Sequence, residues 1–558
     1  MLHTVIRPPS KDAALTGLPA KSACRLALAF VGALVALQAQ DAPYDFIIRN
    51  ARVVDGTGSP WFRGEIGIRG DQIAAIARRI DAPATRIIDA ANQVVAPGFV
   101  DIHVHALGGA GQPPTVFPIV EVPTADNYVR QGVTTLITGP DGFSPIPLRP
   151  ALELVAKTGI TPNFGSFLGH GSVREAVFGS VNRAPSADEL EGMRAIARQG
   201  MRDGAFGLST GLFYVPATFS KTDEVIEVAK VVGAMGGMHI SHIRDEELDP
   251  EGSVRETIAI GDQGGLPTQV THHKTIGKAA WGKTVATLRQ IDEARQRGVD
   301  VTLDVYPYPA SATTISAALM PTWAQEGTRA DVLSRLRDPV TRRRIMVETI
   351  RILLEGRGGG DARNVMVSRC DWNASLAGQR LDAVAVARGK SNSVEDAADT
   401  ALWLVENGDC GGIYFAISEE DIQRVLRHPA SMIASDGQVV AFGRASPHPR
   451  SYGTFARVLG RYVRELKVLA LEDAIRKMSS YPAQRIGLTD RGILRVGMKA
   501  DLSMFDPDTV RDMSTFDQPH QYAQGVSIVF INGQLVFENG KMTGARPGRV
   551  LNGPAYAR

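Results

Sequence analysis

The sequence predicts an α/β protein whose main domain is a TIM-type (β/α)8 barrel. Two observations lead to this fold class: eight candidate strands alternate with helical patterns across residues 98–486, and β-type segments occupy both residues 41–97 and residues 487–558. The two terminal segments together predict one small β-sandwich domain. A chain of 558 residues that is 44% hydrophobic has enough apolar material for a large core and is too long for one ordinary domain.

The barrel is predicted from short apolar segments that recur with helical patterns between them. The candidate strands are residues 99–105, 134–141, 163–170, 205–210, 239–246, 269–274, 301–308 and 431–436. Between them, spacings such as that of Leu190, Met193, Ala197 and Met201 place apolar side chains on one face of a helix. In such a barrel the reacting groups lie at the C-terminal ends of the strands, because the loops that follow form the mouth.

The interval between the last two candidate strands, about residues 320–417, is far longer than one crossover helix needs. It contains helical stretches at residues 332–336 and 343–354. We therefore expect a helical insertion near the barrel mouth, where it would act as a lid.

Residues 1–40 have the order of a secretory signal peptide: scattered Lys and Arg up to Arg25, an apolar run at residues 26–37, then small and polar residues. The apolar run is shorter than the roughly 20 residues that span a bilayer. We expect an exported protein, periplasmic or secreted, with no stable membrane span. A membrane anchor formed by an uncleaved signal is the alternative.

Charge and cysteine content restrict the partners and the chemistry. The formal net charge is only +2, which gives no field that would favour nucleic acid, so we expect a small-molecule partner. After export, Cys370 and Cys410 would be the remaining cysteines, and neither lies in a CxxC motif. We expect both to be structural, with at most one bridge between them.

The pair His103 and His105 is the first candidate for metal binding. Residues two apart on a strand point to the same face, so both imidazoles can bind one metal. Buried or surface histidines without a metal are the alternative for so short a motif. The position of the pair at the end of the first candidate strand favours the metal.

Two further candidate strands also end in histidine. We expect His242 and His272 to be metal ligands, whereas His239 and His273 point to the opposite side by strand parity. Lys274 shares the face of His272 and would place a positive charge near the substrate. For each strand alone the alternative is a core histidine with satisfied hydrogen bonds; three strands that all end in histidine favour a shared metal site.

Asp436 ends the last candidate strand. A buried carboxylate at a barrel mouth, beside metal-binding histidines, is suited to act as general base. A cap of the following helix is the alternative. The expected metal is Zn²⁺, as one or two ions, and other divalent metals also suit such ligands.

Nine short motifs along the chain resemble those of a known family. The matching motifs are residues 95–105, 132–135, 204–212, 241–246, 272–274, 281–283, 304–308, 435–437 and 448–455. Over about residues 45–545 the chain resembles the amidohydrolases, and within them the D-aminoacylases or N-acyl-D-amino-acid deacylases. The family's architecture, a barrel with a terminal β-sandwich, matches the fold predicted above.

The resemblance adds residues to the predicted site. Family members often carry a cysteine metal ligand after the second strand, where this chain has Asp141; a carboxylate also binds zinc, and a helix cap is the alternative. The resemblance implies that Lys274, Tyr306 and Arg450 contact the substrate, with Arg244 as a fourth, since cations suit a free carboxylate. A surface salt bridge is the alternative for Arg450. The position of a family serine holds Ala312 in this chain.

The expected activity is zinc-dependent hydrolysis of N-acyl-D-amino acids, which releases a carboxylate and a D-amino acid. The preference for the D-isomer is implied by the resemblance alone. One alternative is a related amidohydrolase that acts on a cyclic amide, a β-aspartyl dipeptide or another amide outside proteins. The other is a non-catalytic scaffold with this fold, which the retained His103, His105, His242, His272 and Asp436 disfavour.

Overall fold

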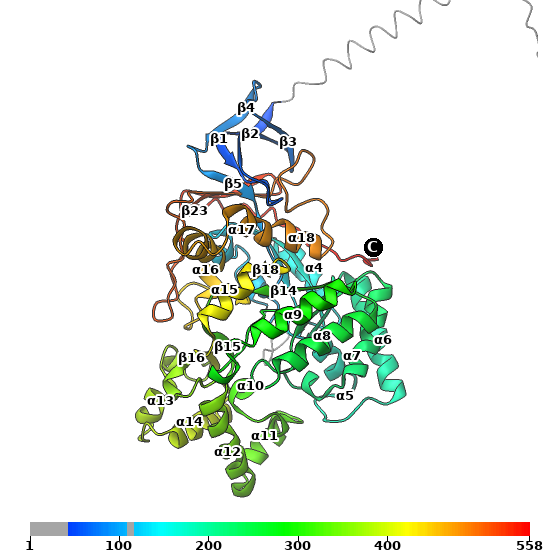
Figure 1. Cartoon of the computed structure of the whole chain (residues 1–558), viewed down its shortest axis with the longest axis vertical. Coiled ribbons are helices and arrows are strands. Elements are labelled where there is room, and N and C mark those ends of the chain that lie inside the picture. The colour runs from blue at the N-terminus through cyan, green and yellow to red at the C-terminus, as the bar shows by residue number, and fades with distance from the viewer. Residues whose placement is uncertain (1–42, 109–116, 558) are drawn as a thin grey trace, which may run out of the picture.

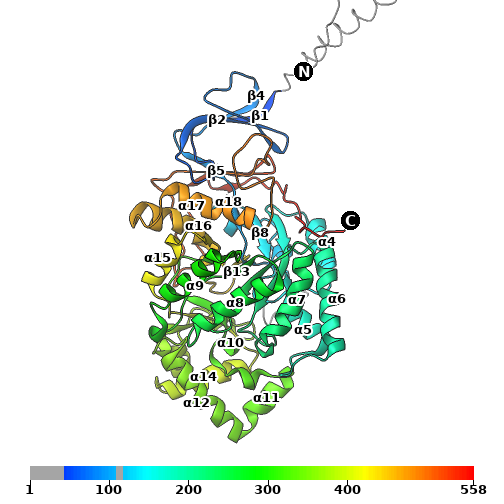
Figure 2. The same cartoon turned by 45° about the vertical axis from the view of Figure 1, so that its right-hand side comes forward.

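The computed structural model describes residues 43–108 and 117–557. The predicted signal peptide, residues 1–40, lies outside the described residues. In Figure 1 the sheet of the terminal segments, the barrel and the insertion follow one another along the long axis of the molecule. The sheet domain and the insertion therefore lie at opposite ends of the barrel, as the turned view in Figure 2 also shows.

Eight parallel strand positions form the barrel, which confirms the predicted fold. In chain order they are β6 (Phe99–Asp101) with β7 (Val104–His105), β8 (Val133–Thr138), β9 (Asn163–Ser166) with β10 (Leu168–Gly169), β11 (Gly207–Gly211), β12 (Met238–His242), β13 (Thr268–Val270), β14 (Val301–Val305), and β18 (Ser431–Ile433) with β19 (Gly437–Gln438). Neighbouring strands pair in this order, and β19 closes the ring by pairing with β7. The closed sheet formed by the described strands therefore has no edge strand with unpaired backbone groups.

Helices surround the strands and apolar side chains fill the interior. The main outer helices are α4 (Arg149–Thr158), α5 (His170–Phe178), α6 (Ala187–Asp203), α7 (Thr222–Ala234), α8 (Pro250–Gly264), α9 (Thr284–Gln296), α15 (Glu419–Arg427), α16 (Arg450–Arg457) and α17 (Leu471–Met478). Val100 on β6, Ile240 on β12 and Met432 on β18 pack in one buried cluster although their strands lie far apart around the ring. Ala483 of α18 (Ser480–Arg485) joins this cluster, so α18 covers the N-terminal end of the barrel.

Both chain ends contribute strands to one nine-stranded sheet. Its strands are β1 (Tyr44–Val53), β2 (Phe62–Arg69), β3 (Gln72–Ala77), β4 (Ala84–Asp89), β5 (Val94–Pro97), β20 (Leu502–Phe505), β21 (Val526–Ile531), β22 (Gln534–Glu538) and β23 (Lys541–Met542). The two halves meet where β5 pairs antiparallel with β20. The sequence placed all of residues 487–558 in this domain, but the final residues leave it: Leu551 N donates to Phe164 O on the barrel, and Gly553 N donates to Gly204 O.

The insertion between β14 and β18 differs in part from the prediction. It has helices α10 (Ile315–Leu319), α11 (Arg329–Arg337), α12 (Pro339–Glu355), α13 (Leu381–Ala387) and α14 (Val394–Glu406). It also has a three-stranded antiparallel sheet, β15 (Ser311–Thr314), β17 (Gly411–Tyr414) and β16 (Val365–Arg369), which the sequence did not predict. Each strand is only four or five residues long and pairs with a distant segment, so local periodicity gave no signal.

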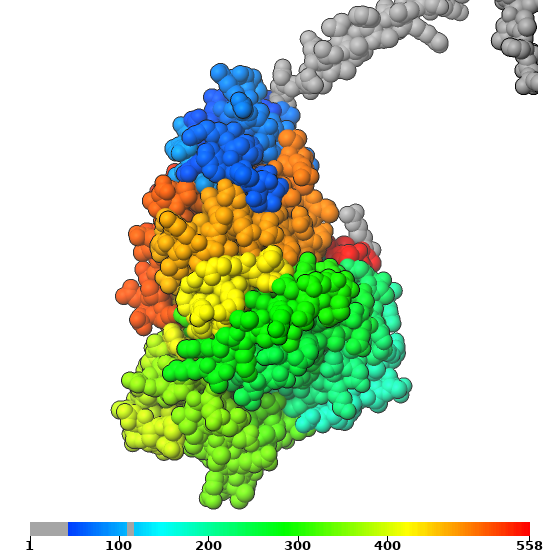
Figure 3. Space-filling model, viewed as in Figure 1, coloured from blue at the N-terminus to red at the C-terminus, as the bar shows by residue number. Residues whose placement is uncertain are grey.

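A disulfide joins Cys370 to Cys410 within the insertion. The bond links the end of β16 to the start of β17, so it fastens the small sheet. Figure 3 shows the surface of the insertion, in yellow-green, continuous with the green surface of the barrel helices. Among the described residues, none of the helices combines the length and hydropathy that a membrane crossing needs.

Candidate active site

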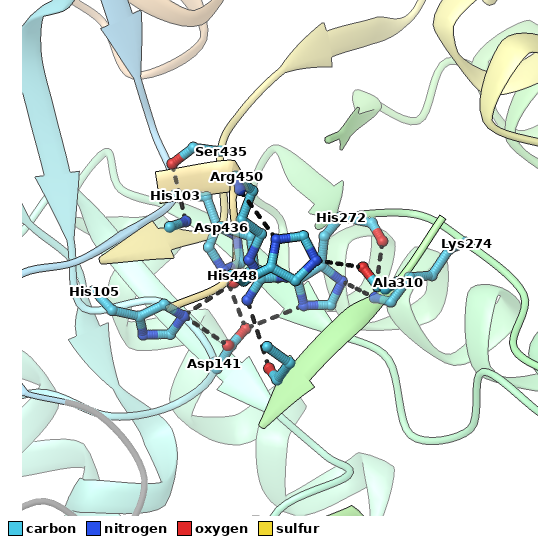
Figure 4. Close-up of polar contacts among 12 residues, drawn as sticks. His103, His105, Asp141, His272, Lys274, Ala310, Ser435, Asp436, His448 and Arg450 are labelled. Carbon is cyan, nitrogen blue, oxygen red and sulfur yellow. Dashed lines mark hydrogen bonds and ion pairs between the residues drawn. The ribbon is translucent and has the colours of Figure 1, made fainter. Parts of the chain in front are cut away.

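All the predicted metal ligands and the predicted base converge at the C-terminal ends of the barrel strands. His103, His105, Asp141, His242, His272 and Asp436 come from five different strands. Figure 4 shows Asp141 between His105, His272 and the Asp436 region, with its carboxylate pointing into the group. The six side chains that the sequence singled out therefore lie together at the barrel mouth.

The ligand atoms form two groups that share Asp141. The first group is His103, His105, Asp141 and Asp436; the second is Asp141, His242 and His272. Oδ1 of Asp141 lies 3.4 Å from His103 Nε2, 3.6 Å from His242 Nδ1 and 3.4 Å from His272 Nε2. Its other oxygen, Oδ2, lies 3.5 Å from His105 Nε2. Asp141 is thus placed to bridge two metal positions.

Three of these side chains project from residues with left-handed backbone. The φ angle is 57° at Asp141, 35° at His272 and 52° at Asp436. Residues other than glycine rarely adopt this conformation, because it costs energy. It persists only where the surrounding packing maintains it, and such residues are concentrated at functional sites. At each of these positions the strand has just ended, and the turn directs the side chain over the barrel mouth.

The donor set fits a divalent cation. Both ring nitrogens of His103 and of His242, and Oδ1 of Asp141, are buried without a hydrogen-bond partner among the described residues. Buried polar atoms without partners are costly. One nitrogen of each ring lies within 4.8 Å of a ligand atom of Asp141, His103 in the first group and His242 in the second. Imidazole nitrogens and carboxylate oxygens are ligands of zinc, so a bound zinc ion would satisfy the ring nitrogen that faces Asp141 and the Asp141 oxygen.

Electrostatics in the cluster favour positive charge between the carboxylates. Burial alone would raise the pKa of Asp141 and of Asp436, but His103 near the first and Arg450 near the second hold both pKa values well below the ordinary range. Burial alone would lower the pKa of His103, but the same two carboxylates raise it well above its ordinary value. A metal cation would take the place of this proton.

The predicted substrate residues Lys274, Tyr306 and Arg450 lie beside the cluster. Arg450 Nη1 is 2.7 Å from Asp436 Oδ2. The Arg450 guanidinium lies 4.7 Å from the centre of the Tyr306 ring, and Lys274 Nζ lies 5.5 Å from it. The hydroxyl of Tyr306 is buried without a hydrogen-bond partner among the described residues. Arg450 is buried in an ion pair, so it is not a surface salt bridge.

Arg244 is the predicted substrate residue that the structure does not bring to the cluster. Its guanidinium donates to Glu256 and to the backbone oxygens of Thr218 and Ser220. Strand β12 ends at His242, so alternation along the strand does not set the direction of residue 244. Arg244 braces the loop after β11, and a contact with substrate has no support from this geometry.

Two charged residues at the site were not predicted. Glu246 is buried and contacts His242, His272 and Lys274. Arg357 comes from the insertion and contacts Glu246 at 2.9 Å. The position of Glu246, four residues after His242, is a signal that sequence reasoning could have used. Arg357 lies 111 residues along the chain from Glu246, so no local pattern points to it.

The remaining histidines on these strands face elsewhere, as parity predicted. His239 bonds to Thr210 and Thr268, and His273 bonds to Thr287. His170, the last residue of the candidate strand 163–170, begins helix α5 instead of ending a strand and lies 3.5 Å from Glu224. None of the three belongs to either ligand group.

Comparison with known proteins gives relatives over nearly the whole chain. A model of the Amidohydrolase family matches residues 378–537. The D-aminoacylase of Alcaligenes xylosoxydans xylosoxydans is 35% identical over 547 residues, which cover 92% of this chain and 99% of that protein. The chain belongs to the D-aminoacylase family. A second member, the N-acyl-D-glutamate deacylase of the same organism, is 36% identical over 91% of this chain and 96% of its own length.

Solved structures of this family agree with the fold. A crystal structure of D-aminoacylase superposes with a TM-score of 0.76 at 34% identity, covering 91% of this chain and all of that one. N-acyl-D-glutamate deacylase from Bordetella bronchiseptica, solved with zinc and a phosphonate that mimics the tetrahedral intermediate, superposes with a TM-score of 0.74 at 32% identity, covering 92% and 100%. A dihydropyrimidinase from Brevibacillus agri, 16% identical with a TM-score of 0.57, shares the fold.

Proposed function

We propose that the protein hydrolyses the amide bond of N-acyl-D-amino acids with zinc as cofactor, releasing a carboxylate and a D-amino acid. The observation that carries this proposal is the convergence of His103, His105, Asp141, His242, His272 and Asp436 at the barrel mouth. Membership in a family whose named members are deacylases of N-acyl-D-amino acids supports the substrate class.

The two ligand groups support two metal positions. Asp141, His242 and His272 would hold one zinc ion, and His103, His105 and Asp436 would hold a second ion that shares Asp141. Zinc, when bound, supplies Lewis acidity that polarises a carbonyl and lowers the pKa of water towards neutrality. Asp141 would contribute a carboxylate to both positions, and this ligand is harder than the thiolate common in the family.

Asp436 is the proton-transfer residue of the proposed reaction. Because its pKa is held well below the ordinary range, it is ionised at neutral pH and can accept the proton of the attacking water. It then passes that proton to the leaving amine nitrogen. Arg450, 2.7 Å away, keeps the carboxylate oriented during both transfers.

The cations and Tyr306 would hold the substrate. Lys274 and Arg450 suit the free α-carboxylate through charge-assisted hydrogen bonds. The Tyr306 hydroxyl, which is buried with no partner among the described residues, would donate to an oxygen of the substrate. A donor already in place at the reacting carbonyl stabilises the charge that develops there.

The test is amino-acid release from matched N-acyl-D and N-acyl-L libraries that include cyclic imides and β-aspartyl dipeptides, before and after chelation. We expect release from N-acyl-D-amino acids, loss on chelation and recovery with zinc. Asp436→Asn should abolish release while the zinc position of Asp141, His242 and His272 stays filled. Turnover of cyclic imides alone, or undiminished activity of Asp436→Asn, would contradict the proposal.

We also propose that the protein is exported to the periplasm or beyond the cell. The order of charged, apolar and small residues in residues 1–40 supports this. The disulfide between Cys370 and Cys410 is further support, because such bonds persist in oxidising compartments. Cell fractionation with N-terminal sequencing tests the proposal; a cytosolic protein that retains residues 1–40 would refute it.

A further inference from the structure

Glu246 is a buried carboxylate that lies behind two of the metal-site histidines. Its side chain is 1% exposed, with Oε2 3.7 Å from His242 Nε2 and Oε1 3.4 Å from His272 Nδ1. The other ring nitrogens, His242 Nδ1 and His272 Nε2, face Asp141. Each imidazole therefore lies between Asp141 on the metal side and Glu246 on the far side.

The orientation of a metal-binding histidine depends on the polar groups behind its ring. A histidine that binds metal through one ring nitrogen directs the N–H of the other to a carboxylate or carbonyl, which fixes the tautomer and the ring orientation. Here Glu246 Oε2 lies 3.7 Å from His242 Nε2. Lys274 Nζ, 2.8 Å from His272 Nδ1, links that ring to Glu246 Oε1. Lys274 Nζ donates to Oε1 of Glu246 at 2.5 Å, so this carboxylate also positions the lysine.

Arg357, from the insertion, holds Glu246 from the other side. Its side chain is 2% exposed; Nη2 lies 2.9 Å from Glu246 Oε2, and Nε lies 3.0 Å from Glu247 Oε1. The guanidinium also packs over the ring of Phe213 at 4.3 Å, and that ring stacks on His242 at 5.4 Å. Arg357 thus reaches His242 both through Glu246 and through Phe213.

A glycine turn brings Arg357 this close to the barrel. Helix α12 ends at Glu355, and Gly356 lies against the barrel loop, where an added Cβ would be 2.0 Å from Glu247 Oε2. At Gly358 an added Cβ would be 2.2 Å from the backbone oxygen of Leu353. A side chain at residue 356 would displace the Glu247 carboxylate, which contacts Arg357, and a side chain at residue 358 would change the turn itself.

We propose that Arg357 is a positioning residue of the metal centre, which orients His242 and His272 by fixing Glu246. The insertion therefore completes the barrel's metal site, and its docking through Arg357 is required for tight zinc binding. The inference rests on the zinc centre of the proposed function and is independent of which amide is cleaved.

The experiment measures the zinc affinity of the full-length protein by competition with a chelator. Arg357→Met and Glu246→Gln should each weaken the zinc position of Asp141, His242 and His272 by about 10- to 100-fold, the usual effect of losing such a partner. Arg357→Lys, which keeps the charge but loses the forked geometry, should lie between wild type and Arg357→Met. The control is Arg342→Met, which removes two ion pairs inside the insertion, to Asp399 and to Glu406.

A double-mutant comparison separates positioning from a general loss of structure. If Arg357 acts through Glu246, the protein with both substitutions should lose no more zinc affinity than the worse single variant. The melting temperature of each metal-free variant shows whether the fold is retained. If Arg357→Met destabilises the insertion, the zinc affinities of Arg357→Lys and Glu246→Gln are compared with that of wild type instead.

Wild-type zinc affinity in folded Arg357→Met, or losses that multiply in the double variant, would overturn the inference. Equal losses in Arg357→Met and the Arg342→Met control would also overturn it. A wild-type protein that binds zinc but leaves N-acyl-D-amino acids intact would contradict the proposed function alone, since the zinc measurements need no substrate.

Discussion

Two histidines on strand β12 show how the environment of a residue decides its chemistry. His242 points over the barrel mouth toward Asp141, whereas His239, three residues earlier, is enclosed between the hydroxyls of Thr210 and Thr268. Burial lowers the pKa of His239 to about 3, and no carboxylate opposes this effect. His239 is therefore a neutral structural residue over the whole range in which the enzyme would work.

This residue predicts a loss of stability in acid. The pKa of His239 is about 3 in the folded state and near 6.5 when unfolded, so its contribution is complete above pH 6.5 and is lost as pH falls towards 3. Between pH 7 and pH 5 the loss is about 2 kcal/mol. Urea unfolding of the metal-free protein at both values measures it, and His239→Gln should reduce the difference. An unchanged pH dependence in this variant would contradict the assignment.

At the scale of elements, the barrel depends on close approach between neighbouring strands. Gly207 on β11 pairs with Met238 on β12 in parallel register. An added Cβ at Gly207 would lie 2.0 Å from the backbone oxygen of Met238, which cannot move without displacing the strand. The pairing of β11 with β12 therefore requires glycine at position 207. This pairing aligns β12, which ends at His242.

Two matched glycine substitutions test this. Gly207→Ala should destabilise the protein by about 1–3 kcal/mol through overpacking. Gly192→Ala, within helix α6 where the nearest atom is 3.6 Å away, should be stabilising by up to about 1 kcal/mol because alanine favours helix. Chemical denaturation of both variants gives the comparison. If the two substitutions change the free energy of unfolding equally, the close contact between strands at Gly207 does not contribute to stability.

At the scale of the whole molecule, the insertion is held to the barrel at several separate points. Its strand β15 follows shortly after barrel strand β14, and Arg357 contacts Glu246 and Glu247. Within the insertion, the disulfide between Cys370 and Cys410 closes a separation of 40 residues. The bond restricts the unfolded insertion more than it changes the folded one.

Removal of the disulfide should therefore loosen the insertion before the barrel. The paired substitution Cys370→Ser and Cys410→Ser should lower the stability of this part by about 4 kcal/mol, from the entropy of a loop of this length. Limited proteolysis should then cut within residues 320–417 faster than in wild type, with reduced wild type as the comparison. Cleavage at an unchanged rate would show that the helices of the insertion need no such bond.

Much of the site could be predicted from the sequence because its signals are local. Residues at the ends of barrel strands face a common mouth, and alternation along a strand separates His242 from His239 without a structure. The resemblance did not predict the position of Arg244, which follows the end of β12 and pairs with Glu256. The sheet of the insertion also escaped prediction, since short strands that pair with distant segments leave no periodic pattern.

The sequence by itself determined the eight-stranded barrel, the convergence of its histidines with Asp436 and the family of the chain. Only the tertiary structure decided that Asp141 lies between two ligand groups and that Arg357 of the insertion reaches Glu246 behind the histidines. The physical reason is that periodicity and residue chemistry act over a few neighbouring residues. A contact between side chains 111 residues apart depends on how the whole chain packs.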